Sequence, residues 1–174
     1  MKISSLVLLV LFLFGCKSDE RRMIDDINRL EANKSLATSD TLINSYVGFA
    51  NKYPKHDYAV KMLFKAARAS SKGHKPERAY ELYRRIAENY NDTCCTPYAL
   101  MAAGVYLQEK GDIEEAKKVY AQFMRDYPEH PLRNSAELNY QYMNMSETEQ
   151  MERFWKSVEQ QKKLDSLRKL REMH

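Results

Sequence analysis

A period of 37 residues constrains the fold of this chain more than any other feature of its sequence. Two sets of tyrosines recur at this step: Tyr46, Tyr83 and Tyr120 form the first set, and Tyr53, Tyr90 and Tyr127 form the second. Self-similarity at a period of about 20–50 residues is typical of repeat proteins, in which one supersecondary unit packs only on its neighbours. We therefore expect one structural unit repeated three times.

The apolar residues inside each unit follow helical spacing. From Ala79 the apolar positions fall at Tyr83, Ile86 and Tyr90, at steps of 4, 3 and 4, which is one face of a helix. The preceding helices share a second stripe, in which Leu63, Ala66 and Ala67 correspond to Leu100, Ala103 and Gly104. Since no stretch alternates with a period of two over any length, the fold class is predicted to be all-α.

Short breaks separate the expected helices. Gly73 and Gly111 lie in two of these breaks, where a glycine can adopt a positive φ. Thr96 is predicted to be the N-cap of a helix that has Pro97 at its first position. The sequence from Ser146 to Glu149 predicts a capping box at the start of a last helix. We expect this last helix to stack on the third unit through Met151, Phe154 and Val158.

The third unit resembles the tetratricopeptide repeat. The sequence Gly111-Asp112-Ile113-Glu114-Glu115-Ala116 matches the family's turn into its second helix in full, and Gly104, Tyr120 and Pro128 stand at further family positions. The first unit is degenerate, and its apolar residues Met23, Ile27 and Leu30 indicate a register slipped by one. The resemblance covers roughly residues 40–135. It implies a right-handed solenoid of antiparallel helix pairs, with about three such units and a C-terminal capping helix.

A Tyr-Pro-x-His sequence follows the second helix of two units, at Tyr53 to His56 and at Tyr127 to His130. Long repeats that close with Tyr-Pro are similar to those of the BamD and YbgF types of outer-membrane lipoprotein. This resemblance implies a scaffold that holds other envelope proteins, such as a barrel-assembly or Tol-Pal component.

The N-terminal residues predict export and lipidation. The apolar run from Leu6 to Phe14 is too short to span a membrane, which takes about 20 residues. The end of this run, Leu13-Phe14-Gly15-Cys16, resembles a bacterial lipobox, which implies cleavage before Cys16 and a lipid on its sulfur. Because Lys17 rather than Asp follows the cysteine, the resemblance favours the outer membrane. The periplasmic face is the expected side, and a short acidic run at Asp19 and Glu20 leaves surface exposure open.

Composition and motifs argue against several functions. The formal net charge of +4 is too balanced for a nucleic-acid-binding protein. No phosphate-binding loop or nucleophile elbow is present, so we expect no enzyme activity and no cofactor. The four histidines lie in expected loops or at the terminus without nearby acids or cysteines at ligand spacing, so we expect no metal site.

Cys94 and Cys95 are adjacent in the turn before the third unit. In an oxidising compartment such a pair can form an adjacent disulfide, bridge to another molecule or remain reduced. The CxxC spacing of redox enzymes is absent, which favours a structural or incidental role over a redox one.

The repeat family implies a candidate binding surface, since the first helix of each of its pairs lines a concave face. Counting positions from Val60 and Pro97 assigns six residues to this face: Lys61, Phe64, Arg68, Tyr98, Met101 and Val105. Large apolar side chains beside two cations suit a peptide with an acidic element. The alternative is that Phe64 and Met101 pack against neighbouring helices.

The predicted organisation has four parts: a signal peptide at residues 1–15, a lipidated cysteine and tether at 16–22, a repeat domain at 23–145 and a C-terminal amphipathic helix at 146–174. The predicted function is an outer-membrane-anchored protein-interaction scaffold in outer-membrane protein assembly or another envelope complex. The alternative is a structural lipoprotein that associates with itself through its C-terminal helix.

Overall fold

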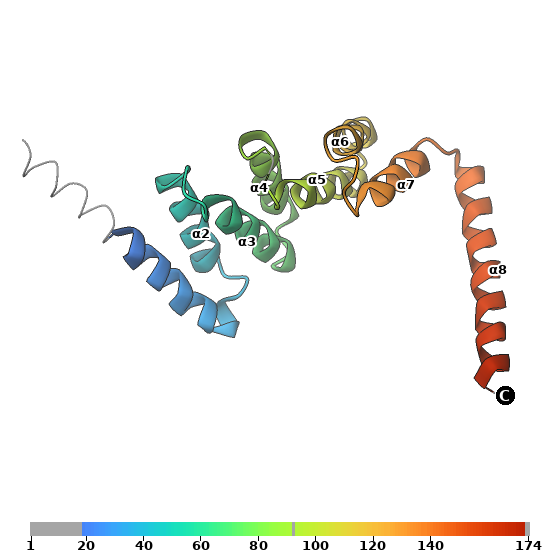
Figure 1. Cartoon of the computed structure of the whole chain (residues 1–174), viewed down its shortest axis with the longest axis horizontal. Coiled ribbons are helices and arrows are strands. Elements are labelled where there is room, and N and C mark those ends of the chain that lie inside the picture. The colour runs from blue at the N-terminus through green and yellow to red at the C-terminus, as the bar shows by residue number, and fades with distance from the viewer. Residues whose placement is uncertain (1–18, 92, 173–174) are drawn as a thin grey trace, which may run out of the picture. The chain divides into compact units, whose positions relative to one another are not determined.

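The structure is a computed structural model that describes residues 19–91 and 93–172. All regular secondary structure in these ranges is helical, so the fold class is all-α, a helical-repeat solenoid (Figure 1). A helix over residues 19–32 comes first. The elements that follow are η1 (Lys34–Leu36), α2 (Asp40–Lys52), α3 (Ala59–Lys72), α4 (Pro76–Asn89), α5 (Thr96–Lys110), α6 (Ile113–Asp126), α7 (Arg133–Met143) and α8 (Glu147–Glu172).

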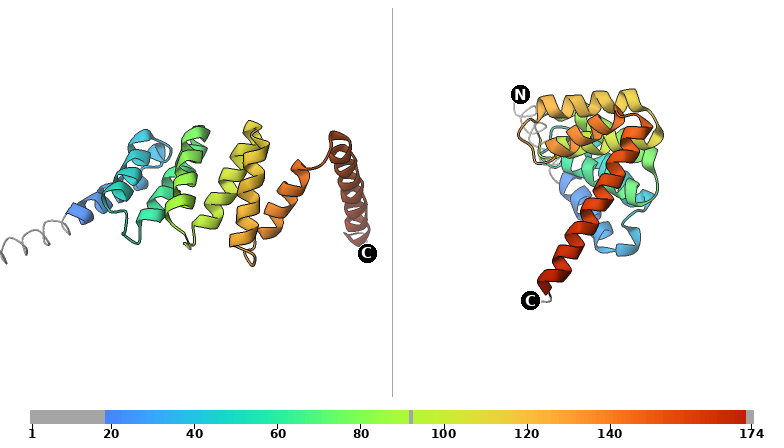
Figure 2. Two further views of the ribbon diagram at one scale, coloured as in Figure 1. Left: turned by 90° about the horizontal axis from the view of Figure 1, so that it is seen from above. Right: turned by 90° about the vertical axis from the view of Figure 1, so that its right-hand side faces the viewer.

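The chain divides into two compact units, of which the first ends at Val119 and the second begins at Tyr120. In the first compact unit, α2 packs on α3, α3 packs on α4, and α4 packs on α5. Figure 2 shows these helices in succession. The stripe Leu63, Ala66 and Ala67 of α3 is fully buried. Small side chains at this stripe allow neighbouring helices to approach closely, because alanine places only one methyl group between two backbones.

Residues at equivalent positions of the three 37-residue repeat units are buried to the same extent. Phe49, Ile86 and Phe123 each have no exposed surface. The first tyrosine set is also buried, while the tyrosines of the second set, which end the helices, are half-buried. This burial confirms the 37-residue register for the second helix of each unit.

The Tyr-Pro-x-His sequence forms an aromatic corner in both places where it occurs. The ring centroids of Phe49 and His56 are 5.3 Å apart and nearly perpendicular, and those of Phe123 and His130 are 5.6 Å apart in the same arrangement. In both corners the histidine Nδ1 accepts a hydrogen bond from the backbone N–H two residues later, at 3.0 Å and 3.1 Å. The recurring histidine is therefore a structural part of the repeat.

The first helix starts earlier than the expected start of the repeat domain at Met23. Residues 19–22, which the sequence assigned to a tether, are helical. Asp19 and Glu20 bind the segment that follows α2. The Tyr53 hydroxyl donates to Asp19 at 3.0 Å, and the Glu20 carboxylate lies 3.1 Å from His56 Nε2. These bonds give the extra turn a folded partner.

The predicted register slip of this helix is confirmed. Ile27 is 1% exposed, and Met23 and Leu30 pack partly buried against the same core. Asp26 and Arg29, which occupy the positions where the unslipped register would need apolar residues, are exposed and form an ion pair.

The two glycine breaks differ, although the sequence allowed a positive φ at both. Gly111 uses this freedom, with a φ of 87°. Gly73 does not use it, since its φ is −85°, and the positive φ of 55° belongs to His74. A Cβ on Gly73 would lie 3.1 Å from the Thr38 Cβ and 3.2 Å from the carbonyl oxygen of Ala69. Gly73 is therefore suited to close packing rather than to a left-handed turn.

The two predicted helix starts have different outcomes. Thr96 is the first residue of α5 rather than its N-cap, which is Cys95. The Thr96 hydroxyl donates to the backbone oxygen of Tyr90 instead of capping the helix. The capping box of α8 is confirmed, because the Ser146 N–H donates to Glu149 at 2.8 Å and the Glu149 N–H donates to the Ser146 hydroxyl at 3.3 Å. The Ser146 N–H and the Ser146 hydroxyl both donate to the Glu149 carboxylate, and these two bonds lower its pKa.

The second compact unit, which begins at Tyr120, has a small core around Tyr120, Phe123 and Ala136, all fully buried. Asn139 of α7 donates a hydrogen bond to the Tyr120 hydroxyl at 3.1 Å. The predicted stacking of α8 through Met151 and Phe154 is wrong, because these side chains are 57% and 56% exposed and no residue of α8 is buried.

Within residues 19–91 and 93–172, no helix combines the length and the apolar character needed to cross a membrane.

Candidate functional site

The predicted surface residues lie on α3 and α5, which are the first helices of two repeat units. Phe64 and Arg68 lie on α3, and Tyr98, Met101 and Val105 lie on α5. Phe64 and Met101 are half-buried, while Tyr98 is 47% and Val105 38% exposed. Phe64 and Met101 therefore each have a packed part and a solvent-facing part, and their role in binding stays a prediction.

An aromatic cluster joins three helices of the first unit at this surface. The Phe64 ring lies 5.8 Å from the Tyr83 ring of α4 and 6.4 Å from the Tyr98 ring of α5, with both pairs close to edge-on. Such pairs stabilise by about 0.5–1.5 kcal/mol beyond the area they bury. Burial also raises the pKa of the Tyr83 hydroxyl, so this group is a neutral hydrogen-bonding group near neutral pH.

Two hollows open on either side of Tyr83 and Tyr98. The first, of about 430 Å³, is lined by Phe64, Arg68, Tyr83 and Tyr98. The second, of about 460 Å³, includes Met101 and Val105 as well as the two shared tyrosines. We call this surface the aromatic groove and define it by eight lining residues: Phe64, Arg68, Tyr80, Tyr83, Tyr98, Met101, Val105 and Tyr106. It can accept several apolar side chains of one ligand in a row.

Tyr80 and Tyr106 were missed by the sequence reasoning. Their rings stack 4.7 Å apart at an angle of 19°, one from α4 and one from α5. Tyr80 directly follows Ala79, and Tyr106 directly follows Val105, so each lies beside a position that the repeat register had already assigned. The sequence feature that could have indicated these two residues is a tyrosine directly after an assigned position on each of the two helices.

Four cations lie along one face of α3. Lys61, Lys65, Arg68 and Lys72 are spaced by 4, 3 and 4 residues, and α3 contains no acidic residue. We call this set the cationic ridge. Lys65 donates to Glu31 at 2.6 Å, and the Lys61 ammonium lies 5.5 Å from the centre of the Tyr58 ring. Neither Arg68 nor Lys72 makes an ion pair with any residue that the structure describes.

A third hollow, of about 340 Å³, lies on the other side of the cationic ridge. Lys65, Arg68 and Lys72 line it together with Glu31 and Tyr46. Burial would raise the pKa of the Glu31 carboxyl, but the hydrogen bonds from Lys65 and Tyr46 outweigh it and lower that pKa. Arg68 thus lines hollows on both sides of α3, which places its guanidinium where an acidic ligand group can reach it.

Five of the six predicted surface residues therefore line the aromatic groove. Lys61 does not, since it contacts Tyr58 and lines none of the three hollows described above. Within α3 and within α5 the grouping of the other five follows from the helix period, because positions separated by 3 and 4 residues share one face.

Cys94 and Cys95 are free thiols with their Sγ atoms 3.8 Å apart. Cys94 is exposed and Cys95 is buried. Burial, assisted by the hydrogen bond with Cys94, raises the pKa of Cys95 to about 11. Since the thiolate is the reactive form, Cys95 is a poor nucleophile at neutral pH. Cys16, the predicted lipidation site, lies outside the described residues.

Over the part of the chain that the structure describes, no three His, Cys, Asp or Glu side chains converge as a metal site would require. The surface presents aromatic rings, aliphatic side chains and cations on a helical scaffold, and such groups are typical of protein interfaces.

The chain was compared with families of known proteins. The sequence profile named Tetratricopeptide repeat matches residues 98–130, which cover most of α5, all of α6 and the Gly111 turn between them. The chain contains a tetratricopeptide repeat. No curated protein sequence matches the chain. Tetratricopeptide repeats generally bind protein partners, and their all-helical fold is typical of scaffolds rather than of enzymes.

Proposed function

We propose that this chain is a lipid-anchored scaffold of the outer membrane that binds other envelope proteins through its aromatic groove. Its complex serves outer-membrane protein assembly or another function of the envelope. The chain would be attached through a lipid on Cys16, on the periplasmic side of the outer membrane. The tetratricopeptide repeat supports the scaffold role, and the lipobox-like sequence before Cys16 supports the anchor.

The aromatic groove is the observation that carries this proposal. Tyr98 and Val105 expose apolar surface beside half-buried Phe64 and Met101, and Arg68 lies at the same hollow as Phe64. A protein interface typically has a buried aromatic centre with Arg and Tyr among the residues that contribute most to affinity. The groove offers this combination on a rigid helical frame.

A matched pair of tyrosines tests the groove. Tyr98 and Tyr58 are both 47% exposed and both lie at the start of a first helix, but only Tyr98 lines the groove. We expect Tyr98→Ser to lose crosslinks to partner proteins in whole cells, whereas Tyr58→Ser keeps them. Both variants should unfold at nearly the same temperature as the parent. Equal crosslinking by the two variants would reject the groove as the binding surface.

The double change Phe64→Ser with Met101→Ser separates binding from packing. A binding role predicts lost crosslinks with a small change in thermal stability, because both side chains keep part of their surface in water. A purely structural role predicts a clear drop in the unfolding temperature. If stability and crosslinks are both retained, neither residue belongs to the interface.

The anchor has its own test. Cys16→Ala should leave an unprocessed precursor that incorporates no labelled palmitate and no longer fractionates with the outer membrane. Cys94→Ala is the control, because Cys94 is an exposed thiol elsewhere in the chain and should keep the label. Palmitate on the Cys16→Ala protein would contradict the lipobox assignment.

Partner identity follows from a crosslinked pull-down out of detergent-solubilised envelopes. Recovery of a barrel-assembly subunit or a Tol-Pal component with the parent, and its loss with Tyr98→Ser, would name the complex. Recovery of the same proteins with Tyr98→Ser would place the contact on another surface.

A further inference from the structure

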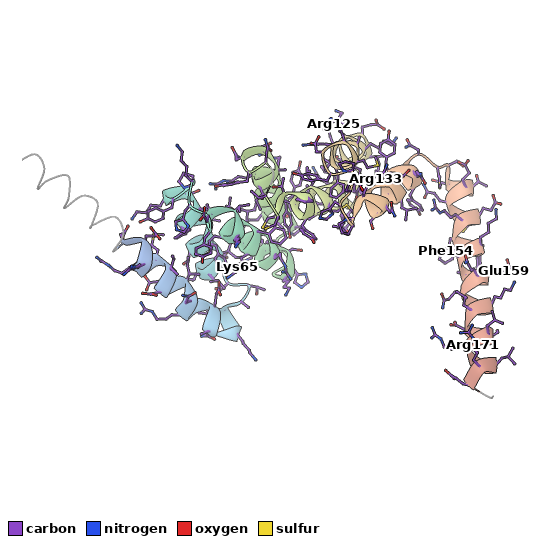
Figure 3. The ribbon with its side chains drawn as sticks, viewed as in Figure 1. Lys65, Arg125, Arg133, Phe154, Glu159 and Arg171 are labelled. Carbon is purple, nitrogen blue, oxygen red and sulfur yellow. The ribbon has the colours of Figure 1, made fainter. Side chains whose placement is uncertain are left out.

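The first half of α8 exposes an apolar stripe that nothing described in the structure covers. Met151, Phe154 and Trp155 are 57%, 56% and 60% exposed, and Val158 is half-buried. We call these four residues the α8 stripe. Figure 3 shows Phe154 standing out from the ribbon of α8. Their positions follow the spacing i, i+3, i+4 and i+7, which is the pattern by which an amphipathic helix lies in a groove.

The second half of α8 has its apolar residues on a different side. Leu164, Leu167 and Leu170 follow at steps of three. At about 100° per residue they lie roughly 100–220° around the helix from Met151, whereas the α8 stripe stays within about 60° of it. One flat surface, such as a lipid layer, therefore cannot cover both sets. A groove that takes only the first half of α8 can cover the stripe.

The charges of this first half are opposite to those of the cationic ridge. Residues 147–159 contain four acids and two bases, while α3 contains four cations and no acid. Glu152 and Glu159 lie beside the α8 stripe, seven residues or about 10.5 Å apart along the helix. Lys61 and Arg68 have the same separation on α3. Two helices laid along each other can therefore place two acids against two cations.

We infer that the first half of α8 from a second copy of this chain docks in the aromatic groove. The α8 stripe fills the hollows lined by Phe64, Tyr83 and Tyr98, and Glu152 and Glu159 lie against the cationic ridge. This inference goes beyond the proposed scaffold function, because it names the chain itself as a ligand that competes with other partners for the groove.

The start of α8 is bonded to the end of α7. The Gln150 side chain donates to the backbone oxygens of Tyr142 and Met145, at 3.3 Å and 3.0 Å, and the capping box closes the first turn. These bonds hold the beginning of α8 to the end of α7. Because groove and stripe are different surfaces, the contact is heterologous, and each copy can bind two others.

Trp155 reports the docking directly, since it is the only tryptophan in the sequence. We expect its fluorescence emission to shift to shorter wavelength as the concentration of the mature chain, residues 16–174, rises, in step with mass measured by sedimentation. All proteins begin at position 16 and carry Cys16→Ala, so that neither a lipid nor the apolar run from Leu6 to Phe14 contributes. A concentration-independent emission maximum, or association without any change of Trp155 emission, would overturn the inference.

Matched substitutions on the two halves of α8 locate the contact. Phe154→Ser should weaken self-association about ten-fold or more, as expected for an aromatic anchor. Leu167→Ser is the control, because Leu167 is 50% exposed on the other side of the same helix and should leave association unchanged. The opposite result, with Leu167→Ser the disruptive change, would refute docking through the first half.

Complementation shows that the two surfaces meet between copies. Arg68→Glu impairs the groove and Phe154→Ser impairs the helix, so each variant alone should remain monomeric. A mixture should form dimers and nothing larger, because one intact groove and one intact helix remain per pair. Failure of the mixture to associate would overturn the inference. Partner crosslinks that Tyr98→Ser removes and Phe154→Ser retains would support the scaffold proposal independently of this outcome.

Discussion

The aromatic corner formed by the Tyr-Pro-x-His sequence allows a quantitative test of the repeat architecture. Phe49 has no exposed surface and contacts the rings of Tyr53 and His56, each at 5.3 Å between centroids. Phe49→Ala would remove a buried aromatic side chain from a region bounded by helices, where the cavity collapses only in part. The expected loss is about 3–5 kcal/mol in the free energy of unfolding.

Urea denaturation followed by circular dichroism measures this loss. Each kcal/mol shifts the unfolding midpoint of a chain of this size by about 2–4 °C, so thermal unfolding should move by roughly 10 °C. Because the chain has two compact units, the change should appear in the transition of the first unit. Tyr58→Ala is the control: Tyr58 also contacts His56 at 5.3 Å but is 47% exposed, so we expect a loss below about 1 kcal/mol. If Phe49→Ala cost no more than Tyr58→Ala, the corner would not be part of the core.

Three further predictions concern single side chains. Gly111 has a φ of 87° and open space where a Cβ would lie, so Gly111→Ala should cost about 1 kcal/mol in urea denaturation and Gly111→Asn less; equal costs would contradict a purely backbone origin. The folded protein lowers the pKa of the Glu31 carboxyl. The stabilisation from its bonds with Lys65 and Tyr46 is therefore fully present above the usual carboxyl pKa of 4.5 and is lost as the pH falls through the lower pKa of the folded state. Glu31→Gln should therefore cost less than about 1 kcal/mol at pH 7 because the ion pair is solvent-accessible, and nothing once Glu31 is protonated in acid; a cost that persists there would refute the assignment. In a Cys16→Ala background, maleimide should modify Cys94 rapidly and Cys95 only on unfolding, and comparable rates by peptide mass spectrometry would contradict the raised pKa of Cys95.

Local and periodic information determined much of this protein. The 37-residue period and the 3.6-residue helical period together specify which side chains face inward, so the burial of Tyr46, Phe49, Ile86 and Phe123 could be predicted from spacing. The capping box at Ser146 was predictable because both of its partners lie within four residues. The lipid anchor and the outer-membrane location remain predictions.

The candidate site was predictable only in part. Phe64, Arg68, Tyr98, Met101 and Val105 share the groove because each helix brings its own positions to one face. Tyr83 joins them from α4, and Tyr80 and Tyr106 stack between α4 and α5. A spacing rule describes one helix at a time, so it does not show which side chains of two helices meet.

Tertiary contacts decided the remaining features. Gly73 has an ordinary φ and packs closely against Thr38, 35 positions earlier in the chain, while the positive φ lies at His74. The stripe of Phe154 and Trp155 has the spacing of a packed helix face and yet lies exposed. Spacing determines which residues share a face, whereas the surface that covers this face depends on where other helices lie, and that is set by contacts between residues distant in sequence.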